Sequence, residues 1–181
     1  MKRQAIPVDK FSLPIVSSFH ERWMLLTAGE NAPGKFNTMT VSWGGLGEVW
    51  NKPMAMVLVR PSRYTFEFID KNADFTLCVL PGEFKDQLTL CGTRSGRAID
   101  KIQATGLTPL TSSVVAAPGF NEAELIIECR KMYYDDIKPA NFLSPHIEGN
   151  YNGKDYHRLY FGEILSIHGT PAYSASTSAK P

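Results

Sequence analysis

The chain has 181 residues and a mass of 20.1 kDa, with 43% hydrophobic and 20% charged residues. This composition is typical of a globular protein and excludes a disordered or fibrous chain. The length suits one domain with a full core. Nineteen basic and eighteen acidic residues leave a net charge of +1. No overall field therefore favours nucleic acid or an acidic membrane surface as a partner.

The longest uncharged run, residues 102–121, contains Thr, Ser, Gly and Pro and cannot form a membrane-spanning helix. Charges at positions 9 and 10 interrupt the N-terminal segment before an apolar signal core forms, so we expect a cytoplasmic protein. Three separated cysteines, Cys78, Cys91 and Cys129, exclude a disulfide scaffold. The four histidines also stand apart, so we expect no metal site.

Short strand patterns dominate the chain. The expected strands, in chain order, cover 23–28, 36–43, 54–59, 75–80, 123–134 and 156–167. Three short helices are expected over 64–71, 83–91 and 97–104. Many strands with few helices predict a mainly β protein, a closed or partly closed β-barrel with short helices. We expect a single domain over residues 1–170 and a flexible tail over 171–181.

The segment 37–43 (NTMTVSW) is the most informative part of the sequence. In a strand, Thr38, Thr40 and Ser42 share one face and form a row of hydroxyls opposite an apolar row. Such a row suits either a half-exposed strand or a face laid against a polar, planar ligand.

A glycine-rich stretch, residues 44–47, follows this segment between Trp43 and Trp50. Glycine allows a close approach of the backbone, and aromatic planes beside it suit a flat ring system. The alternative is a connector whose two tryptophans lie in the core.

The segment 60–65 (RPSRYT) joins an expected strand to an expected helix. Ser62 is a natural N-cap, and the first-turn amides lack helical acceptors. Capping alone does not explain Arg60 and Arg63, because positive charge at a helix N-terminus is mildly unfavourable. These residues together indicate an anion site, suited to a phosphate.

Two weaker signals follow. The segment 93–97 (TRSGR) precedes Asp100 and Lys101, and Lys101 could reach a phosphate or pair on the surface. His157 opens the last long strand, and a lone histidine is more often structural than catalytic.

Five motifs in order resemble the flavin reductase-like family of FMN-binding split barrels, which includes flavoredoxin. They are FNTMTVSWGG (36–45), WNKP (50–53), VRPSRYT (59–65), CGTRSGR (91–97) with Asp100-Lys101, and YHRLYFGEI (156–164). The resemblance covers residues 23–167. It implies a split β-barrel of Greek-key type, usually a homodimer, with FMN near the dimer interface.

By this resemblance, FMN would lie along Asn37, Thr38, Met39, Thr40, Val41, Ser42 and Trp43. Its phosphate would be held by Arg60, Ser62, Arg63 and Thr65. A second contact region would include Ser95, Gly96, Arg97 and Lys101. His157 would lie on the nicotinamide side of the flavin, with NADH or NADPH as electron donor.

Two functions fit these expectations. One is an NAD(P)H-dependent flavin reductase-like oxidoreductase. The other is an FMN-binding electron-transfer carrier, similar to flavoredoxin, that a protein partner reduces. A barrel that has lost its flavin is a third alternative, and the retained Arg63, Thr65 and hydroxyl row count against it. The chain has no dinucleotide-binding fingerprint, so a nicotinamide would bind in the open cleft.

Overall fold

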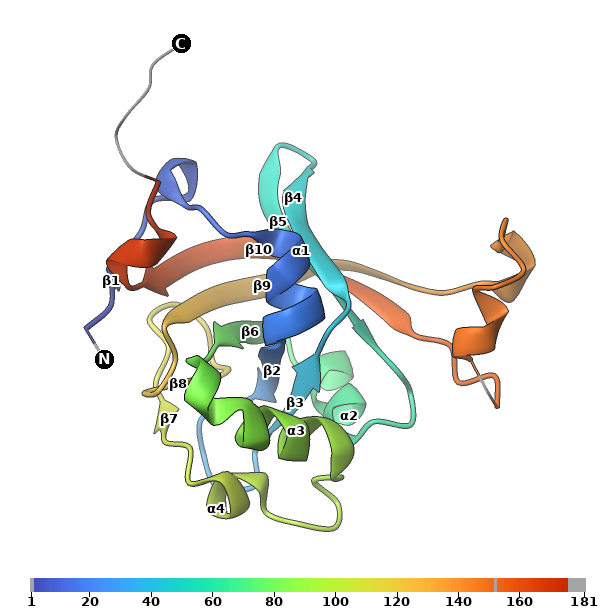
Figure 1. Ribbon diagram of the computed structural model, residues 1–181, viewed down its shortest axis with the longest axis horizontal. Helices are drawn as coiled ribbons and strands as arrows, with labels where there is room; N and C mark the ends of the chain where they lie inside the picture. Colours follow the sequence, from blue (N-terminus) through green and yellow to red (C-terminus); the bar gives the residue numbers. More distant parts are fainter. Residues whose placement is uncertain (1, 152, 176–181) are drawn as a thin grey trace.

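Antiparallel strands make up most of the fold in the computed structural model, which describes residues 2–151 and 153–175 (Figure 1). The strands are β1 (Gln4–Ala5), β2 (Met24–Gly29), β3 (Phe36–Val41), β4 (Gly44–Val49), β5 (Lys52–Val59), β6 (Asp74–Val79), β9 (Leu125–Asp136) and β10 (Arg158–Gly169). Two further strands, β7 (Pro109–Leu110) and β8 (Gly119–Phe120), pair only with each other. The mainly β prediction is thus confirmed.

The main sheet is ordered β3-β2-β6-β9-β10-β5-β4, and β1 pairs with β10. Its two edge strands, β3 and β4, are consecutive in the chain and are joined by Ser42 and Trp43 alone. Two residues span less than about 10 Å, so the sheet must curl until its edges meet. No ladder joins β3 to β4 among the described strands. The result is a split barrel, in which the opening between the unpaired strands β3 and β4 begins at Ser42 and Trp43.

Short helices lie outside the barrel, and two of them pack on β2 and β3. The α-helices are α1 (Ile15–Ser17), α2 (Tyr64–Lys71), α3 (Lys85–Thr93) and α4 (Lys101–Thr105). The π-helix η2 covers Ser18–Arg22, and the 3₁₀ turns are η1 (Val8–Lys10), η3 (Gly82–Phe84), η4 (Pro139–Asn141), η5 (Glu148–Asn150) and η6 (Pro171–Tyr173). Helix α2 has the predicted bounds.

Two apolar clusters stabilise this arrangement. The larger cluster fills the barrel and includes Leu26, Val57, Phe75 and Tyr160. The smaller one, which includes Leu88, lies under α3 and α4. Because both faces of β2 and β6 are covered, every residue of these strands is buried.

The six predicted strands are present with ends shifted by one or two residues. Strand β5 is buried on one face only, through Ala55, Val57 and Val59. The glycine-rich stretch is not a loop, since it forms β4 paired with β5. A Cβ on Gly44 would lie 2.6 Å from the Phe19 ring, so the close approach that glycine allows is made to the core.

The first residues of the predicted C-terminal tail make contacts with the domain. Tyr173 is buried, and its hydroxyl donates to Glu124 at 2.9 Å. The Ala175 amide donates to the Lys10 carbonyl at 2.7 Å. Residues 171–175 are therefore packed against the domain, and the rest of the predicted tail, 176–181, lies outside the described residues.

Across the described ranges, no helix has the length and apolar character needed to cross a membrane.

Candidate functional site

Two adjoining cavities lie at the opening of the barrel. The α2 cavity, about 410 Å³, lies at the start of α2, and the β3 cavity, about 200 Å³, follows the end of β3. Both are lined by Met39, Arg60 and Arg63. The two cavities therefore form one elongated site with a basic middle.

The structure brings thirteen of the sixteen predicted site residues to this site. They are Met39, Thr40, Val41, Ser42, Trp43, Arg60, Ser62, Arg63, Thr65, Ser95, Gly96, Lys101 and His157. The other three, Asn37, Thr38 and Arg97, line a third cavity of about 650 Å³ between the β2–β3 turn and α4.

The hydroxyl row of β3 is largely used inside the protein. Thr38 Oγ1 donates to the Leu26 carbonyl at 3.1 Å and accepts from Thr27 Oγ1 at 3.0 Å. Thr40 Oγ1 donates to the Leu88 carbonyl in α3. These bonds fix β3 between β2 and α3, while the side chain of Ser42 stays exposed. A ligand in the β3 cavity would meet an acceptor lone pair of the Thr40 hydroxyl and the exposed hydroxyl of Ser42.

The start of α2 differs from the prediction. Its N-cap is Arg63, with extended backbone and no side-chain cap bond, so the predicted Ser62 cap is wrong. Ser62 instead donates to the Asp155 carboxylate. Among the bonds of the described residues, the Tyr64 and Thr65 amides have no acceptor, whereas the Phe66 amide donates to the Arg63 carbonyl at 3.0 Å. Two amides at the positive end of the helix are thus available to an anion.

A carboxylate from a distant part of the chain reaches this helix start. Asp155 accepts from the Ser62 amide at 3.3 Å and from the Ser62 hydroxyl. It lies two residues before His157, in the segment 137–157 that joins β9 to β10 (orange in Figure 1). Nothing in the sequence predicts this contact, because Asp155 and Ser62 are 93 residues apart.

Arg60 connects the same segment to the site. Its Nη2 donates to the Asn150 carbonyl at 2.8 Å, and its guanidinium lies 5.2 Å from the centre of the Tyr151 ring. Arg63 Nη1 donates to the Gly92 carbonyl at 2.8 Å. A guanidinium has five N–H donors, so both arginines keep donors for a ligand.

His157 is buried at the edge of the β3 cavity. Its Nδ1 lies 3.1 Å from the Tyr151 hydroxyl, and its ring centre lies 5.0 Å from that of Trp43. Burial, with Arg60 adding to it, lowers the pKa of His157 to about 4. The imidazole is therefore neutral at pH 7, and it offers a ligand a hydrogen bond rather than a charge.

Lys101 is 6% exposed and does not pair on the surface. Its Nζ donates to the carbonyls of Thr38 and Cys91, both at 2.8 Å, so it joins β3 to α3. Burial lowers its pKa to about 8. Gly96 is packed equally closely, since a Cβ there would lie 2.2 Å from Asn37 Oδ1.

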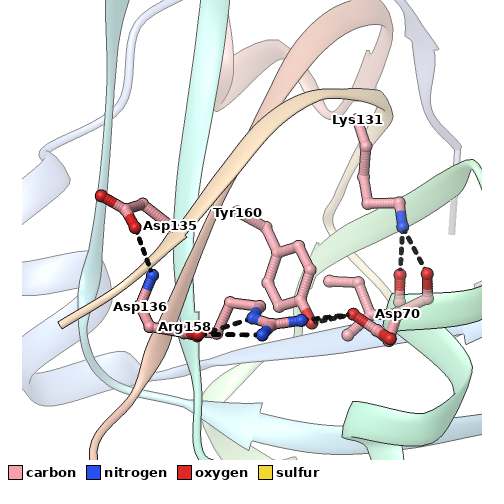
Figure 2. Close-up of polar contacts among 7 residues, drawn as sticks. Asp70, Lys131, Asp135, Asp136, Arg158 and Tyr160 are labelled. Atoms are coloured by element: carbon pink, nitrogen blue, oxygen red, sulfur yellow. Dashed lines mark hydrogen bonds and ion pairs between the residues drawn. The ribbon is translucent and has the colours of Figure 1, made fainter.

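A polar cluster holds the other end of α2 to the last strand (Figure 2). Arg158 Nη1 donates to Asp70 at 2.8 Å, and its Nε donates to Asp136 at 2.7 Å. Tyr160 donates to Asp70 at 3.2 Å, and Lys131 Nζ donates to the Asp70 carbonyl at 3.0 Å. Helix α2, which borders the α2 cavity, and the strand that follows His157 are thereby fixed to each other.

The remaining candidate chemistry is limited. Cys78, Cys91 and Cys129 are all buried, and burial raises the pKa of each thiol. In the part of the chain that is described, no group of three or more His, Cys, Asp or Glu residues could hold a metal ion.

The comparison with protein families decides the identity of this fold. The family model of the flavin reductase-like domain matches residues 16–175. The chain belongs to the flavin reductase-like family. The match includes both cavities of the site and every strand of the main sheet except β1.

The following relatives of this flavin reductase-like chain are distant in sequence. An uncharacterized protein of Archaeoglobus fulgidus is 26% identical over 149 residues, which cover 82% of this chain and 72% of that protein. Solved structures with the same fold include the following three. An FMN-binding domain of a flavin reductase-like enzyme from Shewanella baltica has a TM-score of 0.66 at 15% identity, over 93% of this chain and 77% of its own. Flavoredoxin of Desulfovibrio vulgaris has a TM-score of 0.64 at 20% identity, over 95% of this chain and 78% of its own. Flavoredoxin from Methanosarcina acetivorans has a TM-score of 0.64 at 24% identity, over 96% of this chain and 78% of its own.

Proposed function

We propose that this flavin reductase-like chain binds FMN along the two cavities and acts as an NAD(P)H-dependent flavin reductase-like oxidoreductase. The observation that carries the proposal is the pair of unengaged amides at the start of α2 beside Arg60 and Arg63. A phosphate dianion fits this donor set, because it combines backbone N–H groups, a helix N-terminus and two guanidinium groups.

The two cavities would hold different parts of FMN. The α2 cavity would hold the phosphate through Arg60, Arg63 and the Thr65 amide. The β3 cavity would hold the ring against the strand end. FMN, when bound, supplies a group that accepts a hydride or electrons and passes them on. The neutral His157 would orient a ligand on the open side without adding charge.

A second candidate is an electron-transfer carrier that a protein partner reduces. One observation favours it: the β3 cavity has only about 200 Å³, and Trp43 and His157 narrow it. That volume suits one ring system better than a flavin and a nicotinamide stacked together. The flavoredoxins named above share this fold.

Steady-state oxidation of NADH and NADPH by the FMN-loaded protein separates the two. A reductase consumes either nucleotide with free flavin as acceptor. No consumption, together with full reduction by a chemical or protein electron donor, would favour the carrier and contradict the reductase.

We further propose that the chain forms a homodimer through the outer face of β5, β9 and β10. This face carries Met56, Tyr133 and Phe161, which are neighbours across the strands. Trp50, 59% exposed, packs on Tyr133 with ring centres 6.0 Å apart. The face continues to Leu58 in the β3 cavity, so a second copy would adjoin the ring end of the site. Sedimentation at the monomer mass would contradict this interface.

A further inference from the structure

The Asp155 carboxylate makes the contacts expected of a bound anion. It accepts hydrogen bonds from the backbone amide and the hydroxyl of Ser62, two residues before α2 begins. It also lines the α2 cavity with Arg60, Arg63 and Lys101. A negative group at this place is stabilised by the helix end and by the neighbouring cations. The chain thus carries its own anion in the cavity that the proposed function assigns to the flavin phosphate.

We propose that Asp155 is a specificity-determining residue that competes with the phosphate of the ligand for the start of α2. Asp155 and a phosphate at the Thr65 amide would use different donors but would lie in one partly enclosed cavity, where two negative groups repel each other strongly. The phosphate of a bound flavin therefore displaces the carboxylate from Ser62. This inference rests on the proposed binding of FMN.

Displacement of Asp155 would also affect other contacts of the segment that carries it. The segment 137–157 is also held by the bond from Arg60 to the Asn150 carbonyl and by the contact of Arg60 with the Tyr151 ring. A phosphate that draws Arg60 toward itself would loosen these contacts together with that of Asp155. Occupation of the α2 cavity and release of the segment are thus coupled.

The competition selects among anions. A free phosphate must displace Asp155 with its own contacts alone. FMN adds the contacts of its ring and ribityl chain in the β3 cavity. Asp155 therefore lowers the affinity for every anion in the α2 cavity, and only an anion attached to a larger ligand overcomes it.

The test compares three ligands on two matched variants. Asp155→Asn keeps the size and one acceptor but removes the charge. Glu148→Gln removes a charge from the same segment, where Glu148 accepts from the Tyr156 hydroxyl at 2.5 Å. Binding of FMN, riboflavin and inorganic phosphate is measured by titration, with phosphate read as competition against FMN.

We expect Asp155→Asn to bind FMN about tenfold more tightly, which corresponds to about 1.4 kcal/mol. Inorganic phosphate should also bind Asp155→Asn more tightly and compete more strongly with FMN, whereas the affinity of this variant for riboflavin should stay unchanged. Glu148→Gln should bind all three ligands as the unsubstituted protein does. Unchanged or weaker FMN binding by Asp155→Asn overturns the inference but leaves the proposed function intact. Absence of FMN binding by the unsubstituted protein refutes both.

A second measurement needs no variant. Hydrogen exchange of the unsubstituted protein is compared with and without FMN, and with riboflavin. FMN should protect the amides of residues 62–65 and speed exchange at residues 153–155, whereas riboflavin should leave residues 153–155 unchanged. Slower exchange at residues 153–155 with FMN would contradict displacement of Asp155.

Discussion

Arg63 offers the sharpest test of the phosphate assignment. Its side chain lines both cavities, and the only hydrogen bond of that side chain among the described residues goes to the Gly92 carbonyl. As N-cap it makes no side-chain cap bond, so Arg63→Ala leaves the start of α2 intact. A charge-assisted bond contributes about 1.5–3 kcal/mol, so losing one to the phosphate lowers FMN affinity about 10- to 150-fold.

The assay is the ratio of the dissociation constants of FMN and riboflavin, measured by flavin fluorescence. Riboflavin lacks the phosphate, so Arg63→Ala should change its affinity little. Lys71→Ala is the matched control, because it removes a positive charge from the exposed opposite end of the same helix. Equal losses for FMN and riboflavin in Arg63→Ala would show that Arg63 is not at the phosphate.

Three further outcomes follow from the structure. The pKa of His157 should be near 4 by NMR titration, and a midpoint above 6 would contradict the burial of its ring. Because this pKa lies below the ordinary value of 6.5, the stability that the neutral His157 contributes is lost as pH falls from 6.5 toward 4. Lys101→Met leaves two carbonyls unpaired and should cost about 1–3 kcal/mol in urea unfolding. Lys101 loses its proton near pH 8 in the folded protein but only near its ordinary pKa of 10.5 in the unfolded chain. This difference raises the free energy of unfolding between pH 8 and 10.5, and Lys101→Met should lack that rise. Gly96→Ala should lower the free energy of unfolding by about 1–3 kcal/mol, because the added Cβ forces Asn37 aside. Gly82→Ala, with open space around it, should not; equal melting temperatures for the two variants would refute the close packing at Gly96.

The sequence predicts the elements whose pattern is local. Helix α2 is amphipathic over its whole length, so its bounds are predicted correctly. Alternation and apolar runs likewise locate the long strands. Strand β4 is missed because Gly44 and Gly45 are typical of a loop, and its strand conformation comes from pairing with β5. Trp50 and Asn51 then take positive φ angles in the turn, which is unusual for a tryptophan.

The site is predicted in its residue types but not in its contacts. The helix start with two arginines is visible as RPSRYT, since an anion site needs those groups at that spacing. The engagement of Thr38 and Thr40 depends on β2 and α3, which only the tertiary fold brings near. Burial of Lys101 and the contact of Asp155 with Ser62 likewise have no local signal.

The central claim is that the two cavities bind FMN. The most direct measurement is the visible absorbance spectrum of the purified protein, with the chromophore of a denatured sample identified, followed by titration with FMN. We expect flavin bands from released FMN, or saturable uptake of added FMN with quenched fluorescence. A colourless protein that takes up no FMN would contradict the claim.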